Sequence, residues 1–91
     1  MERLNELKPV YCDTFPETFK PGELYISHKY HIAGHLCLCG CGNKSILPLR
    51  PHNPKGWSIA EKDGKVTLRA SVLNVFCGSH YFITDNKIEW L

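Results

Sequence analysis

The residues best suited to chemistry are cysteines gathered in two short segments. Cys37, Cys39 and Cys41 stand in the run CLCGCG, and the second segment is CGSH, residues 77–80. Thiols this close in sequence cannot form unstrained disulfides with one another, because a disulfide needs separated Cα atoms and suitably directed Cβ atoms. Clustered thiols from two chain segments are typical of a structural zinc site. We therefore predict one zinc ion bound between the two segments.

Five side chains compete for the four positions that zinc normally offers. They are Cys37, Cys39, Cys41, Cys77 and His80. Alternate residues of a strand start about 7 Å apart on one face, so two sulfurs on one ion require a bend in the chain. Gly40 and Gly42 allow that bend. We expect these ligands: Cys39, Cys41, Cys77 and His80. Cys37 is the alternative ligand, and its use would leave His80 free.

A second chemistry is available in serine and histidine residues near the cysteines. A site rich in thiolates makes a poor Lewis acid and no H-E-x-x-H motif is present, so the zinc is expected to be structural. Ser71 and Ser79 are possible nucleophiles, with His35 or His80 as the base. Neighbouring residues of a strand point to opposite faces, so His80 is a poor partner for Ser79. We therefore expect His35 to serve Ser71 or Ser79, the alternative being that both serines are ordinary turn or strand residues.

Composition narrows the class of protein. The 91 residues are enough for one small domain, whose limited core would benefit from a metal. Eleven Lys and Arg residues against nine Asp and Glu give a net charge of +2 without a basic stripe, which predicts no nucleic-acid partner. No segment is apolar enough to span a membrane, and the odd cysteine count without a secretion signal predicts a reduced, cytoplasmic protein.

The pattern of the chain predicts a mostly β fold, a small antiparallel domain of hairpins stapled by one zinc. Residues 1–21 are expected to form an arm packed on the core, and residues 22–91 the zinc-binding β domain. The dipeptides Asp63-Gly64 and Asp85-Asn86 mark two hairpin turns. Strands are expected at residues 23–27, 32–38, 45–49, 57–60, 66–69, 81–84 and 87–90.

Taken together, these residues resemble a family of small bacterial proteins that are often encoded beside ubiquitin-like conjugation genes. The resemblance runs from about Gly22 to Leu91 and is carried by the pattern H-x-C-x-C-G-C-G, a tryptophan, a serine followed by valine or isoleucine, and C-x-S-H-Y/F-x-I. Here these are residues 35–42, Trp57, Ser71 and residues 77–83. The combined pattern is specific, although each part alone is not. The family commonly has Pro where this chain has Leu38 and Ala70.

The resemblance implies a peptidase, deubiquitinase-like in action, that matures a bacterial ubiquitin-like modifier or removes it from its targets. Its implied site draws on His35, Ser71, Ser79 and His80 around the cysteine-bound metal. Expected partners are the modifier, its conjugates and the conjugation enzymes. A non-catalytic, zinc-stapled adaptor that binds a modifier or a conjugation enzyme is the alternative from a different class, because the short chain contains no unambiguous catalytic signature.

Overall fold

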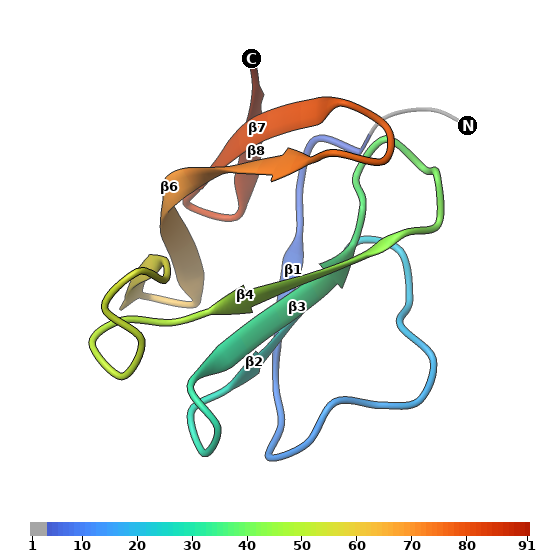
Figure 1. Cartoon of the computed structure of the whole chain (residues 1–91). Helices are drawn as coiled ribbons and strands as arrows, with labels where there is room; N and C mark the ends of the chain where they lie inside the picture. Colours follow the sequence, from blue (N-terminus) through green and yellow to red (C-terminus); the bar gives the residue numbers. More distant parts are fainter. Residues whose placement is uncertain (1–3) are drawn as a thin grey trace.

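Eight β-strands make up the fold in the computed structural model, which describes residues 4–91 (Figure 1). The strands are β1 (Lys8–Tyr11), β2 (Glu23–Ser27), β3 (Ile32–Leu36), β4 (Lys44–Pro48), β5 (Ser58–Lys62), β6 (Lys65–Asn74), β7 (Ser79–Thr84) and β8 (Lys87–Trp90). They form two four-stranded sheets, ordered β1-β2-β3-β4 and β5-β6-β7-β8. No helix occurs within these residues, and so none that could cross a membrane. The mostly β prediction is confirmed.

The hairpins follow from their turn residues. Asp63 and Gly64 have φ angles of 53° and 76°, and Asp85 and Asn86 have φ angles of 49° and 68°. Two consecutive positive φ angles are the conformation that matches the twist of two-residue hairpins, and Asp, Asn and Gly tolerate it best. Both predicted turns are confirmed, and each lies between two antiparallel strands of the second sheet.

The inner faces of the two sheets supply the core. Alternation is clearest in β7, where Ser79, Tyr81 and Ile83 are buried while the residues between them are half-buried on the outer face. His80 is therefore on the opposite face of β7 from Ser79. The fully buried apolar residues come from both sheets and, in the case of Leu38, from the loop after β3: Leu24, Ile26, Ala33, Leu38, Val66, Leu68, Tyr81 and Ile83.

The N-terminal arm is part of the first sheet. Strand β1 pairs with β2 in parallel, from Lys8 opposite Glu23 to Tyr11 opposite Ile26. Further along the arm the buried ring of Phe19 meets another phenylalanine edge to face. The sequence indicated an extended arm but no strand there, because a four-residue parallel edge strand that contains a proline has no local pattern. Residues 1–3 of the expected arm lie outside the described residues.

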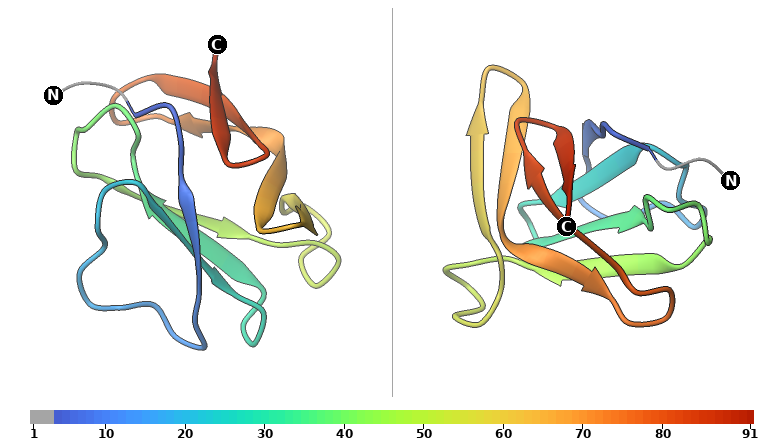
Figure 2. Two further views of the ribbon diagram at one scale, coloured as in Figure 1. Left: turned by 180° about the vertical axis from the view of Figure 1, so that it is seen from behind. Right: turned by 90° about the horizontal axis from the view of Figure 1, so that it is seen from above.

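Strand β6 contains an irregularity that decides the geometry of the site. It pairs with β5 only as far as Arg69, and with β7 the register shifts between Leu68 and Val72. Three residues, 69–71, therefore face the single residue Phe82, and the peptide between Arg69 and the next residue is cis. A bulge of this kind bends a strand, and the bend of β6 is visible in Figure 2. Its first half pairs with β5 and its second half extends past that strand.

Candidate metal centre and serine–histidine pair

The four clustered cysteines converge where the loop after β3 meets the loop between β6 and β7 (Figure 1). The sulfur atoms of Cys37, Cys39, Cys41 and Cys77 all lie within 4.8 Å of one another. The Cys37 sulfur is 3.3 Å from that of Cys39 and 3.5 Å from that of Cys77, and the last two are 3.6 Å apart. A tetrahedron with Zn–S bonds of about 2.3 Å has edges of about 3.8 Å. The four thiols thus fit a soft tetrahedral ion, and a metal ion could be held here.

Polar neighbours are placed to stabilise these sulfurs as thiolates. The amide nitrogen of Asn74 donates to Cys37 Sγ at 3.3 Å, and that of Asn43 donates to Cys41 Sγ at the same distance. The hydroxyl of Ser79 lies 3.2 Å from the sulfur of Cys77. Donors of this type around the ligands orient them and tune a metal site. Ser79 is thus beside the thiols rather than beside a histidine.

The cysteines differ in how easily each loses its proton. Hydrogen bonding to Ser79, and then to Cys37, lowers the pKa of Cys39 to about 6. Hydrogen bonding to Ser79 also lowers the pKa of Cys77. Burial raises the pKa of Cys37 to about 12, because a charged sulfur is costly away from water. A bound cation would deprotonate this buried thiol, since a coordinating thiol becomes a thiolate.

The structure brings together one of the two sets of side chains that the sequence left open. Cys37 belongs to the group of four, and His80 does not. The expected bend is present, with φ angles of 90° at Gly40 and 83° at Gly42. His80 is excluded because strand alternation puts it on the outer face of β7, while Ser79 faces the sulfurs. The geometry therefore matches the alternative set of four cysteines.

His80 instead meets Ser71. Its Nε2 is 2.7 Å from Ser71 Oγ. His80 is directly opposite Leu73 in the β6–β7 pairing, and Ser71 is two residues before Leu73, so the pair are diagonal neighbours on one face. When His80 carries its proton on Nδ1, the serine hydroxyl donates to Nε2, which is the arrangement required for a nucleophile and its general base.

The backbone at Ser71 is fixed from the other side by Trp57, whose Nε1 donates to the Ser71 carbonyl oxygen at 3.2 Å. Trp57 is tied to the end of β4, because its own N–H donates to the Pro48 carbonyl at 2.8 Å. The preceding residue, Gly56, is packed so closely that an added Cβ would lie 2.2 Å from the same carbonyl oxygen. Only glycine fits there, and it allows the loop to hold the indole against Ser71.

His35 lies elsewhere. Its Nε2 is 2.7 Å from the hydroxyl of Tyr81, and its ring is fully buried in the core. Burial lowers the pKa of His35 to about 4, so the ring is neutral. The same Tyr81 hydroxyl accepts from Asn74, which also donates to Cys37. His35, expected as the base, is therefore linked through this network to the cysteines, and it is His80 that the structure brings to Ser71.

Three contributions were not apparent from the sequence. The contact between Ser71 and His80 depends on the register between β6 and β7, and the bulge that makes the two residues diagonal neighbours has no local pattern. Asn43 and Asn74 flank the cysteines but carry no motif of their own, and Trp57 reaches Ser71 across 14 residues. One usable signal was present in the short loop of residues 75–78. Such a loop between antiparallel strands puts its flanking residues, Asn74 and Ser79, opposite each other, and so places His80 opposite Leu73.

Two clefts flank the Ser71 backbone, and Trp57 lines both. One, of about 200 Å³, lies between β4 and the second half of β6 and is lined by Lys44, Ser45, Ile46, Leu47, Trp57, Val72, Leu73, Asn74, Val75 and Phe76. The other, of about 310 Å³, is lined by Arg50, Lys55, Gly56, Trp57, Ser58, Arg69 and Ala70. The first is largely apolar, and the second contains three cationic side chains.

Fold and site define a small all-β protein in which a four-cysteine cluster lies beside an outward-facing serine–histidine pair. The family described as bacterial ubiquitination-like system serine protease (BubE) matches residues 11–91, and the chain belongs to this family. Comparison with curated proteins and with solved structures gives no match. The resemblance drawn from the sequence is thereby confirmed, and the family's name describes a protease of a bacterial ubiquitination-like system.

Proposed function

We propose that the chain is a serine protease in which Ser71 is the nucleophile and His80 its general base. Its substrate is the tail of a bacterial ubiquitin-like modifier, either as a precursor extension or as the bond that joins the modifier to a target. The observation that carries the proposal is the 2.7 Å contact between His80 Nε2 and Ser71 Oγ. The family's description as a protease of a ubiquitination-like system supports the substrate class.

The proposed reaction has two halves. Ser71 Oγ attacks the scissile carbonyl carbon while His80 Nε2 takes the hydroxyl proton, and the resulting imidazolium then protonates the leaving group as that bond breaks. Water then attacks the acyl-enzyme with His80 again as base, and His80 returns the proton to Ser71 Oγ as the ester bond breaks and the acid is released. A positioned base of this kind contributes about 10²- to 10⁴-fold in rate.

We further propose that the ion held by the four cysteines is zinc and that it is structural. Four thiolates complete a tetrahedral coordination sphere and leave no position for water or substrate. The ion would join the loop after β3 to the loop after β6. Asn74, the last residue of β6, donates to Cys37 Sγ, and Ser71 is three residues earlier on the same strand.

An extended tail could add as a strand beside β6. Among the described strands none pairs with β6 beyond Arg69 on the side of β5, and on that edge the Ser71 carbonyl accepts from the Trp57 indole rather than from a strand. The apolar cleft lies along this edge, and Ile46 and Leu73 are about half exposed there, at 48% and 57%. Backbone pairing supplies affinity in strand addition, and alternate side chains supply specificity.

The test is cleavage of a tail-extended modifier by purified protein. Ser71→Ala should abolish cleavage, and His80→Ala should slow it by about 100-fold or more. Ser79→Ala is the matched comparison, since Ser79 is the other serine that the sequence proposed; this variant should still cleave once its metal content is matched to that of the parent. A fluorophosphonate probe should label Ser71, and labelling should disappear in the His80 variant.

Two outcomes would overturn the proposal. Loss of cleavage in Ser79→Ala at full metal content, with cleavage kept in Ser71→Ala, would make Ser79 the nucleophile. Tight binding of the modifier without cleavage or probe labelling would identify a non-catalytic adaptor instead.

A further inference from the structure

The larger of the two clefts beside Ser71 is a basic one. Arg50 and Lys55, from the loop between β4 and β5, line it together with Arg69 of β6. The other lining residues are Gly56, Trp57, Ser58 and Ala70, so the cleft contains three cations and no carboxylate. Three like charges around a cleft of about 310 Å³ create a positive potential that attracts an anionic group.

These charges are not neutralised within the described part of the chain. Its single ion pair joins His28 to Glu61, away from this cleft. The Arg69 guanidinium donates to the Leu68 carbonyl at 2.9 Å, to the Ile83 carbonyl at 3.2 Å and to Thr84 Oγ1 at 2.8 Å. It also stacks over the Phe82 ring, 4.8 Å from its centre.

All three acceptors are neutral, so Arg69 is held in place with its positive charge intact. Two of these three bonds, to Ile83 and Thr84, hold the guanidinium toward β7. Arg50 and Lys55 are exposed and add mobile charge to this fixed one. The cleft is therefore lined by two exposed cations, and a third cationic residue, Arg69, stands at its edge with its charged group held toward β7.

The cleft is adjacent to the proposed nucleophile. Ala70 lines it and directly precedes Ser71, and neighbouring Cα atoms are about 3.8 Å apart. Trp57 lines it too, and its indole donates to the Ser71 carbonyl. A group seated in the cleft would therefore belong to a substrate residue close to the bond that Ser71 attacks.

We propose that this basic cleft is a specificity subsite for a substrate carboxylate within about two residues of the cleaved bond, at the span of an extended chain. The carboxylate is either the side chain of Asp or Glu or the free C-terminus of a short tail extension. The proposal rests on the proposed serine protease function and names its substrate class. It predicts that the enzyme prefers acidic over neutral sequences at this position.

The first test measures binding, which does not require catalysis. Ser71→Ala protein is titrated into fluorescent peptides of one neutral sequence that differ only in Asp or Asn at one position, each with a free or an amidated C-terminus. We expect the carboxylate-bearing peptide to bind about 3- to 10-fold more tightly at low salt, and the preference to shrink as salt rises. Comparing Asp with Asn reports the side-chain source, and comparing free with amidated peptides reports the C-terminal source.

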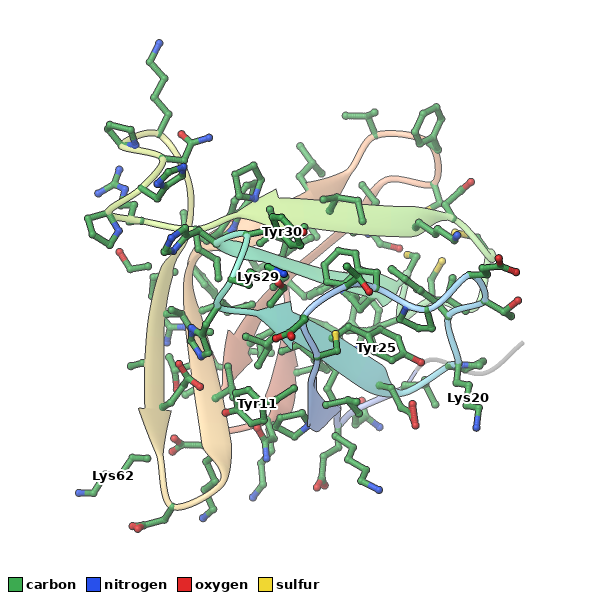
Figure 3. The ribbon with its side chains drawn as sticks, turned by 90° about the horizontal axis from the view of Figure 1, so that it is seen from below. Tyr11, Lys20, Tyr25, Lys29, Tyr30 and Lys62 are labelled. Atoms are coloured by element: carbon green, nitrogen blue, oxygen red, sulfur yellow. The ribbon has the colours of Figure 1, made fainter. Side chains whose placement is uncertain are left out.

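Matched variants locate the effect. Arg50→Ala/Lys55→Ala in the same background should remove most of the preference. Lys62→Ala/Lys65→Ala changes the net charge equally but lies outside the cleft; Figure 3 shows Lys62 at the tip of the β5–β6 hairpin, pointing away from the body of the molecule. This control should keep the preference. The ratio of kcat/KM for the acidic over the neutral substrate, measured in the Ser71 protein, should follow the same order.

Equal binding of all four peptides, or a preference unchanged in Arg50→Ala/Lys55→Ala, would overturn the subsite. The two proposals fail separately. Cleavage that depends on Ser71 but ignores the acidic group would refute only the subsite, whereas a carboxylate preference in binding without any cleavage would refute only the protease function.

Discussion

Removal of the proposed zinc ion should destabilise this protein strongly, and the sulfur distances show why. At 3.5 Å, the separation of the Cys37 and Cys77 sulfurs, two thiolates repel each other by about 5 kcal/mol at an effective dielectric constant of about 20. The whole domain of 91 residues is stable by only about 5–15 kcal/mol. Without a cation the cluster must therefore take up protons or open.

The size of the effect follows from mass action. A free zinc concentration about 100 times the dissociation constant stabilises the folded state by about 2.7 kcal/mol. Each kcal/mol moves the melting temperature of a domain of this size by about 4–8 °C. We therefore expect a strong chelator to lower the melting temperature by about 10–20 °C. Because the ligands must be deprotonated, lower pH should weaken metal binding in the same direction.

The assay is thermal unfolding together with metal analysis of the purified protein, which should contain about one zinc per chain. Cys37→Ser should lose metal and melt early even with zinc added. Cys12→Ser is the matched control, because Cys12 is the one cysteine outside the cluster and its sulfur lies 3.9 Å from the Ile26 backbone carbonyl. A metal-free protein that melts with the metal-loaded one, or equal behaviour of the two cysteine variants, would refute the reasoning.

Three further predictions concern the supports of the site. Trp57→Phe removes the indole hydrogen bond to the Ser71 carbonyl, so urea unfolding should show a free energy of unfolding lower by about 1 kcal/mol. The same variant should cleave more slowly, and an unchanged kcat would show that Ser71 does not need the indole. Gly56→Ala forces a contact of 2.2 Å with the Pro48 carbonyl oxygen and should lower the free energy of unfolding by at least about 1–3 kcal/mol. Ser58→Ala, at an exposed position nearby, should lower it by less than about 0.5 kcal/mol, and equal stability of the two variants would contradict the reasoning. The pKa of His35 is lowered to about 4 by burial, so below the ordinary histidine pKa of about 6.5 the unfolded chain binds a proton that the folded chain does not. As pH falls from about 6.5 toward 4, His35 should therefore lower the free energy of unfolding of the metal-loaded protein by about 1.4 kcal/mol per pH unit, measured by urea unfolding. A flat profile across that range would indicate that His35 is accessible to protons.

Much of the second sheet could be predicted because its determinants are local. Asp63-Gly64 and Asp85-Asn86 specify two-residue turns, and the residues around them alternate between apolar and polar. The cysteine cluster was equally visible, since ligand type and short spacing are properties of the sequence. What the sequence left open was the fourth ligand, because that choice depends on which face of β7 each side chain occupies.

The serine–histidine pair could not be predicted for a different reason. Its geometry depends on a register shift in which three residues of β6 face Phe82, and nothing local fixes the number of residues in such a bulge. The two extra residues keep Ser71 on the outer face of the sheet but move it from a position directly opposite His80 to the diagonal one. The parallel pairing of β1 was missed for a similar reason, as its partner is set by tertiary contacts rather than by its own four residues.

Strand β6 carries both the proposed nucleophile and Asn74, which donates to a sulfur of the cysteine cluster, and this has a consequence for how the enzyme would be classified. Loss of the ion would disturb Asn74, and Ser71 is only three positions away along the same backbone. EDTA or phenanthroline would then inhibit proteolysis without any metal taking part in it. An inhibitor survey alone would assign such a protein to the metalloproteases, while covalent labelling of Ser71 would assign it to the serine hydrolases.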